Sequence, residues 1–182
     1  MRLAMMTRAA LMAAVTAVAA QIAIPLPFSP VPFTLQVPAV VLSGLLLGPR
    51  YGALAQAIYL LVGAIGVPVF AEFRGGLGVL LGPTGGYLLT YPIAAAVAGL
   101  AASAARSASR GRALIVSFLW GCVGLVVIYT GGAIWLSVVT DLPLAVAVAQ
   151  GVLIFVPFDL IKIALAALVA VAAAPAIAPS RV

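Results

Sequence analysis

Two ionisable residues, Asp159 and Lys162, lie in an otherwise apolar segment near the C-terminus. Charges at membrane depth are costly, and they usually serve a substrate, an ion or a proton. Because these two residues are three positions apart, they share one face if the segment is helical. A structural ion pair is the alternative, but a buried pair stabilises a fold poorly, since lost solvation offsets the attraction. We therefore expect the pair to contact a ligand, and a role in proton transfer remains open.

The composition places these charges in an integral membrane protein. Of the 182 residues, 66% are hydrophobic and 7% are charged, and the mean hydropathy is +1.34. A soluble domain carries far more charge. At roughly 20 apolar residues per span, the length suits one all-α domain, residues 1–182, built as a six-transmembrane-helix bundle. The predicted helices are 9–24, 35–47, 51–67, 84–105, 113–138 and 152–174, with a short interfacial piece before the last helix and a kink at Pro157.

The arginines predict the orientation of this bundle. If the N-terminus is cytoplasmic, the outer loops carry Arg74 with Glu72 and Asp141, and the other arginines are all inside: Arg2, Arg8, Arg50, Arg106, Arg110, Arg112 and Arg181. An excess of basic residues marks the cytoplasmic side. Both termini and the central loop 105–112 are therefore expected inside. Since the basic residues are scattered, the net charge of +6 does not indicate nucleic-acid binding.

The polar inventory excludes several classes of chemistry. The chain has no histidine and one cysteine, Cys122, so an imidazole base, an intrachain disulfide and a thiolate metal cluster are excluded. One carboxylate lies in the apolar segments, which excludes an aspartyl dyad. We expect no enzyme activity, no metal and no cofactor.

The first predicted outer loop, Pro25–Gln36, has four prolines and no charge. Prolines at this density prevent a helix and favour extended backbone. Non-helical backbone beside a membrane is tolerated where it packs on protein or lines a cavity. We expect this loop to fold over the mouth of the bundle as a lid.

The second predicted outer loop, Glu72–Tyr87, contains six glycines between Gly75 and Gly86. Glycine lets backbone N–H groups approach a ligand and form anion-binding concavities. The loop also leads into the N-terminus of the fourth helix, where unpaired N–H groups favour a carboxylate. The two outer loops and the charged pair all belong to the outer half of the membrane, so we expect one ligand site there.

Two further patterns have open interpretations. Alanines recur in the first helix at spacings of four, as Ala9, Ala13 and Ala17 with Ala10 and Ala14 beside them. Such rows allow close helix approach, either to another subunit or within the bundle. Aromatic residues are common at membrane interfaces. We therefore expect interface or packing roles for Tyr91, Tyr129 and Trp135, and a ligand contact for Tyr87 alone.

Three motifs occur in order: Val31-Pro-Phe-Thr-Leu-Gln36, Gly82-Pro-Thr-Gly-Gly-Tyr-Leu88 and Phe155-x-Pro-x-Asp-x-x-Lys162. Together they resemble the biotin-transporter substrate-binding subunit, the BioY family of energy-coupling factor (ECF) transporters. The resemblance covers nearly the whole chain. Family members often have Gly-Phe where this chain has Thr90-Tyr91, which affects only the expected local packing.

The resemblance implies a six-helix S-component of the cell membrane that captures biotin from outside. A transmembrane coupling subunit and two cytoplasmic ATPases would supply the energy, or the chain would form a homo-oligomer if it works alone. The alanine row Ala9, Ala13 and Ala17 resembles the surface that contacts the coupling subunit. Carried over by motif, the pocket residues are Thr34, Gln36, Gly82, Thr84, Gly85, Gly86, Tyr87, Asp159 and Lys162.

Biotin suits these residues chemically. Its ureido N–H groups could donate to Asp159, while Lys162 neutralises that aspartate or donates to a biotin oxygen. The two side chains are too close to hold opposite ends of biotin, so its carboxylate would need the glycine loop, the start of the fourth helix or Arg74. The alternatives are a proton-coupled secondary transporter of a small carboxylated solute, with Asp159 as proton carrier, and an accessory protein that binds no small molecule.

Overall fold

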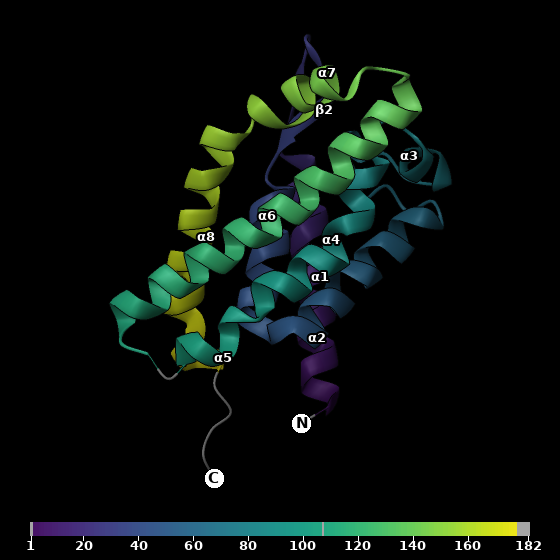
Figure 1. Cartoon of the computed structure of the whole chain (residues 1–182). Helices are drawn as coiled ribbons and strands as arrows, with labels where there is room; N and C mark the ends of the chain where they lie inside the picture. The colour runs from purple at the N-terminus through teal and green to yellow at the C-terminus, as the bar shows by residue number, and fades with distance from the viewer. Residues whose placement is uncertain (1, 107, 178–182) are drawn as a thin grey trace.

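The computed structural model describes residues 2–106 and 108–177, and Figure 1 shows them as a helical bundle. Within these residues, five helices or helix pairs are long and apolar enough to cross a membrane. They are α1 (Arg2–Gln21), α2 (Gln36–Ala64), α4 with α5 (Gly85–Gly99 and Ala101–Arg106), α6 (Arg110–Thr140) and α8 (Val156–Ile177). Their outer faces carry exposed large apolar residues, as expected against lipid, among them Leu11, Val18, Leu119, Val126, Ile161 and Leu165.

Helix α2 is folded back on itself at Gly48, which has a positive φ of 79° and precedes Pro49. In a continuous helix, residues 43 and 56 would be about 20 Å apart. Here Gln56 Nε2 donates to Ser43 Oγ over 3.1 Å. The predicted helices 35–47 and 51–67 are therefore the two antiparallel halves of α2. Each half is short for a span, so the count of six transmembrane helices stays a prediction.

Other predicted bounds shift at their ends. The first helix begins at Arg2 and ends at Gln21, before a strand, instead of covering 9–24. The short piece expected before the last helix is α7 (Leu144–Val148), followed by the π-helical η2 (Ala149–Leu153); its position at a membrane interface stays a prediction. Pro157 is the second residue of α8, where its missing N–H breaks no helical bond. The chain therefore turns just before Pro157, at residues 154–155, instead of kinking within the helix.

The proline-rich loop is extended, as predicted, and it forms a two-stranded antiparallel hairpin that was not predicted. Strand β1 (Ala23–Leu26) pairs with β2 (Ser29–Thr34), with Ala23 opposite Thr34. The tip of the hairpin is held down by Ser29 Oγ, which donates to the carbonyl of Gln150 in η2 over 2.8 Å. The hairpin therefore closes over one end of the bundle (Figure 1).

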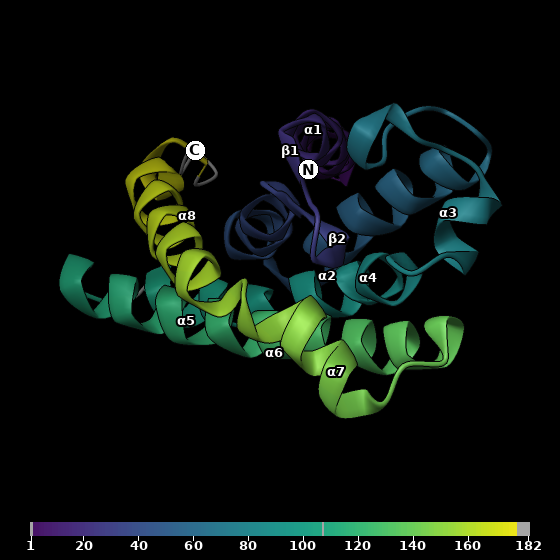
Figure 2. The same ribbon diagram turned by 90° about the horizontal axis from the view of Figure 1, so that it is seen from above.

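The helices surround α2, which contacts α1, α4, α6 and α8 and lies at the centre of the view in Figure 2. Glycine makes this contact close, because a Cβ on Gly44 would overlap the carbonyl oxygen of Ala95 in α4. The bend at Gly48 packs against Gly99 at the end of α4. The centre of the bundle is therefore built on backbone contacts that larger side chains would prevent.

The two ends of the bundle differ in content. The hairpin, α3 (Leu77–Leu81) and α7 lie at the upper end in Figure 1, and the start of α1, the end of α8 and α5 lie at the lower end. The bend of α2 and the start of α6, which carry arginines, belong to the lower end, whereas the loop between α2 and α3 belongs to the upper end. This distribution agrees with the predicted cytoplasmic side. Ser107 of the predicted central loop and Arg181 lie outside the described residues.

Candidate functional site

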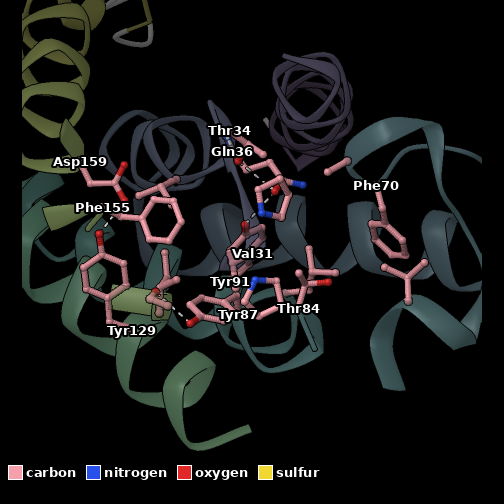
Figure 3. Close-up of a pocket in the computed structure, with 18 of the residues that line it drawn as sticks. Val31, Thr34, Gln36, Phe70, Thr84, Tyr87, Tyr91, Tyr129, Phe155 and Asp159 are labelled. Atoms are coloured by element: carbon pink, nitrogen blue, oxygen red, sulfur yellow. Dashed lines mark hydrogen bonds between the residues drawn. The ribbon is translucent and has the colours of Figure 1, made fainter. Parts of the chain in front are cut away.

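A cavity lies beneath the hairpin, between β2, α4, α6 and the start of α8. The space between these elements is about 770 Å³, including the open solvent at its mouth. Figure 3 shows Asp159, Phe155 and Tyr129 on one side and Phe70 on the other, with Val31, Thr84, Tyr87 and Tyr91 between them. The cavity therefore has two chemically different ends.

The first end is the predicted pair, Asp159 and Lys162, on the first turns of α8. Lys162 Nζ donates to Asp159 Oδ1 and to the carbonyl oxygen of Thr34, each over 2.8 Å, and lies 3.5 Å from the centre of the Phe33 ring. Asp159 Oδ2 accepts a hydrogen bond from the Tyr129 hydroxyl over 2.7 Å. The lysine is fixed by three partners, while each carboxylate oxygen keeps a lone pair for a ligand donor.

Gln36 links this end to the wall of the cavity. Its Oε1 accepts from the hydroxyls of Thr34 and Tyr91, each over 3.2 Å, and its Nε2 donates to Tyr59 over 2.7 Å. Tyr59 in turn donates to the carbonyl of Val69 over 3.1 Å. An amide nitrogen has two N–H donors, so Gln36 has a second donor to offer. The network holds Thr34 and Gln36 in place beside the charged pair.

The second end of the cavity is the loop that carries Glu72 and Arg74, which form an ion pair. The loop is narrow, because the N–H of Phe70 donates to the carbonyl of Arg74 over 2.9 Å. Gln21 at the end of α1 binds the backbone of this loop at two points. Its Oε1 accepts from the N–H of Phe73 over 2.9 Å, and its Nε2 donates to the carbonyl of Phe70 over 3.2 Å. This end is fixed by α1 and open to solvent.

Only some of the residues predicted from the glycine-rich motif line the cavity. Thr84 lines the cavity, whereas Gly82, Gly85 and Gly86 are outside its lining. A Cβ on Gly86 would overlap the side chain of Trp135 in α6, and Trp135 Nε1 donates to the carbonyl of Gly82 over 2.9 Å. Gly86 therefore lets α4 pack on α6, and Gly85 lets the start of α4 lie against the backbone of Leu80 in α3, roles that the ligand hypothesis did not include.

Tyr87 lines the cavity as predicted, and its hydroxyl donates to the carbonyl of Gly151 over 2.9 Å. Tyr91 and Tyr129, for which interface or packing roles were expected, line it as well. A buried carboxylate needs hydrogen-bond donors, and few residues in the middle of α6 can supply one. That requirement is the signal in the sequence that could have identified Tyr129.

The alanine row of α1 is divided by the fold. Ala9 and Ala13 are 0% and 6% exposed and belong to the core that α1 forms with α2, and Ala17 packs partly against the same core. Ala10 and Ala14 are exposed. Ala9 and Ala13 are thus covered by the chain itself, and the small residues that α1 leaves open are those beside the predicted row.

Comparison with known proteins identifies the family. The profile of the BioY family matches residues 1–179. The biotin transporter BioY of Thermotoga maritima is 46% identical over 168 residues, which are 90% of this chain and 91% of the relative. The probable biotin transporter BioY of Pyrococcus horikoshii is 44% identical over 161 residues, 88% of this chain and 90% of the relative.

A solved structure has the same fold. It is the crystal structure of the S-component for biotin from an ECF-type ABC transporter, with a TM-score of 0.83, 30% sequence identity, and coverage of 94% of this chain and 90% of that chain. Together with the multi-pass apolar helices, these matches show that the chain belongs to the BioY family of membrane transport proteins.

Proposed function

We propose that the chain is the biotin-binding subunit of an ECF-type uptake transporter in the cell membrane, and that it captures biotin from the outer side. The observation that carries the proposal is the buried Asp159–Lys162 pair at one end of the cavity, in a family whose relatives are named biotin transporters. Ionised groups at membrane depth are retained chiefly for function. The Asp159–Lys162 pair is suited to binding a ligand with N–H donors. Its carboxylate oxygens remain available as acceptors, and the pair as a whole has no net charge.

The ureido ring of biotin matches the Asp159 end. Its N–H groups are donors, and the Asp159 carboxylate has acceptor lone pairs beyond those used by Lys162 and Tyr129. Hydrogen bonds to an ionised group contribute about 1.5–3 kcal/mol. Gln36 can donate its second amide N–H to the ureido oxygen. Lys162 acts through Asp159, because two of its three donors are used within the protein and the ammonium group also lies against the Phe33 ring.

The apolar parts of biotin match the wall of the cavity. The rings of Phe155, Tyr87 and Tyr91 line the space next to the charged pair, and Figure 3 shows them facing the same opening. Burial of apolar area contributes roughly 25 cal/mol per Å². The thiophane ring and the side chain of biotin would occupy this part of the cavity, which leaves the carboxylate toward the second end.

Transport requires partners, and we infer a transmembrane coupling subunit and two cytoplasmic ATPases. The matched structure is named as a component of an ECF-type ABC transporter. The exposed face of α1, with Ala10 and Ala14, offers small residues that let another helix approach closely. This face replaces the buried Ala9 and Ala13 as the surface open to the coupling subunit.

The decisive experiment is calorimetric titration of the purified protein with biotin and with biotin methylated on both ureido nitrogens. We expect saturable binding of biotin and a loss of at least roughly 100-fold for the methylated ligand, since two hydrogen bonds to a carboxylate are lost. Riboflavin serves as the control vitamin and is expected not to bind. Absence of biotin binding, or equal affinity for the methylated ligand, would contradict the proposal.

A transport assay separates this function from the proton-coupled alternative. Uptake of labelled biotin is expected in cells that also express the coupling subunit and ATPases, and it is expected to fail when the ATPases are inactive. Uptake by the chain alone, abolished by an uncoupler, would favour the proton-coupled transporter instead.

A further inference from the structure

The loop at the second end of the cavity has an unusual backbone. Glu72 has φ 60° and ψ 35°, and the next residue, Phe73, has φ 55°. Side chains other than glycine rarely adopt this left-handed region, and two in succession require support from the surrounding structure. Gln21 and the Phe70–Arg74 backbone bond supply that support. Strained backbone of this kind occurs at ligand clamps, so the loop deserves a functional explanation.

The two cations that line the cavity differ in how readily they can bind an anionic group of a ligand. Among the described residues that line it, the cations are Lys162 and Arg74. Lys162 has its donors on Asp159 and Thr34 and its remaining side against the Phe33 ring. Arg74 is 64% exposed and pairs with Glu72, which is two residues away on the same strained turn. An anionic ligand group in this cavity therefore has Arg74 as its available cation.

Arg74 can receive such a group only by sharing or changing its partner. A guanidinium presents a planar fork of donors that matches one carboxylate at a time in the bidentate geometry. The Glu72 carboxylate contacts the guanidinium through Nη2, and it also lines the cavity. An ion pair this exposed adds little stability, so it can be exchanged at small cost.

We propose that Glu72 is an internal substitute for the carboxylate of the ligand: the two carboxylates exchange on the Arg74 guanidinium when the ligand binds. Glu72 thereby keeps Arg74 paired in the empty cavity and weakens the binding of carboxylated ligands by competition. The inference rests on the proposed function, because it assigns to Arg74 the carboxylate of biotin. It adds that Glu72, although it lines the cavity, lowers the affinity for the ligand.

The experiment measures binding of two probes, biotin and biotinamide, which lacks the negative charge, to four proteins: wild type, Glu72→Gln, Arg74→Gln and the double variant. Glu72→Gln is expected to raise affinity for biotin about two- to fivefold, the range that an exposed ion pair supports, with no change for biotinamide. Arg74→Gln is expected to lower affinity for biotin on the order of tenfold, also without effect on biotinamide. In the Arg74→Gln background, the gain from Glu72→Gln is expected to disappear.

The control is Asp141→Asn. Asp141 is an exposed acidic residue after α6, outside the cavity lining and also at positive φ, a conformation that Asn tolerates. The Asp141→Asn substitution removes the same charge from the same end of the bundle, and it is expected to leave the affinities for biotin and biotinamide unchanged.

Several outcomes would overturn the exchange. Unchanged biotin affinity in Glu72→Gln, or a gain shared by biotinamide or by Asp141→Asn, would do so. A gain that persists without Arg74 would show simple repulsion between carboxylates and would overturn it as well. Unchanged biotin affinity in Arg74→Gln would place the carboxylate elsewhere. If wild-type protein bound neither probe, the proposed function itself would fail, and the exchange with it.

Discussion

The two ion pairs of the cavity share a composition, one acid and one base within three residues of each other, yet they differ in every physical respect. Asp159 and Lys162 have 4% and 10% of their side chains exposed, sit on a regular helix and are tied to α6 and β2. Glu72 and Arg74 have 31% and 64% exposed and sit on a strained turn. The first pair is fixed and the second is exchangeable.

This difference suggests that the two ion pairs bind different parts of a ligand. A desolvated pair cannot separate without leaving an uncompensated charge, so it is suited to recognising neutral donors of a ligand. An exposed pair is screened by water and can separate, so it is suited to exchanging one anion for another. A ligand with a neutral polar head and an anionic tail would use both.

The largest effect is expected from Asp159→Asn, which leaves the Lys162 charge buried without its partner. Breaking one half of a buried pair costs about 3–5 kcal/mol of folding free energy, and biotin affinity is expected to fall at least roughly 100-fold with the loss of an ionised acceptor. Thermal unfolding and calorimetric titration in detergent would measure the two effects. Asp141→Asn, at an exposed site, is expected to change neither.

The double variant Asp159→Asn/Lys162→Met separates stability from recognition. Removing both charges is expected to restore most of the unfolding free energy, because uncharged residues of similar size often replace a buried pair without loss. Biotin affinity is expected to remain at least roughly 100-fold below that of the wild type. Recovery of binding together with stability would show that the pair only supports the fold, and it would remove the contrast between the two ends.

A smaller effect is expected from Tyr129→Phe, which removes one hydrogen bond to the Asp159 carboxylate. A bond to a charged group contributes about 1.5–3 kcal/mol, so both the unfolding free energy and biotin affinity are expected to fall. Tyr87→Phe removes a bond to the neutral carbonyl of Gly151, for which roughly 0.5–1.5 kcal/mol is expected. An equal or larger loss of stability in Tyr87→Phe would contradict the assignment of Tyr129 as the partner of an ionised group.

The sequence alone predicts the fixed end well. Charges are so rare in these apolar segments that Asp159 and Lys162 stand out, and their spacing places them on one helical face. The fold-back at Gly48 is also predictable, because glycine followed by proline interrupts a helix. In each case the signal is local, so one segment of the chain contains all of the information.

What the sequence does not predict depends on contacts between distant segments. Tyr129 meets Asp159 only when α6 packs against α8, and Lys162 meets Thr34 only when the hairpin closes. The glycines at 82, 85 and 86 show a further limit: a missing Cβ permits close approach to a ligand or to a helix, and the sequence does not distinguish the two. The structure places Gly86 against the Trp135 side chain and Gly85 against the Leu80 backbone, and the carbonyl of Gly82 accepts a hydrogen bond from Trp135.

The smallest effect is expected from Phe73→Asn at the exchangeable end. Phe73 is 72% exposed and has φ 55°, a conformation that costs most residues roughly 1–2 kcal/mol and that Asn adopts more easily. We therefore expect a gain in unfolding free energy of about 1 kcal/mol or less, measured by thermal or denaturant unfolding. The matched control is Phe28→Asn in the hairpin turn, which is 59% exposed and is not at positive φ. Equal changes in both variants would show that loss of an exposed aromatic ring explains the result. A gain confined to position 73 would show that the loop stores strain, and this separates the exchangeable end from the relaxed helix that carries the fixed one.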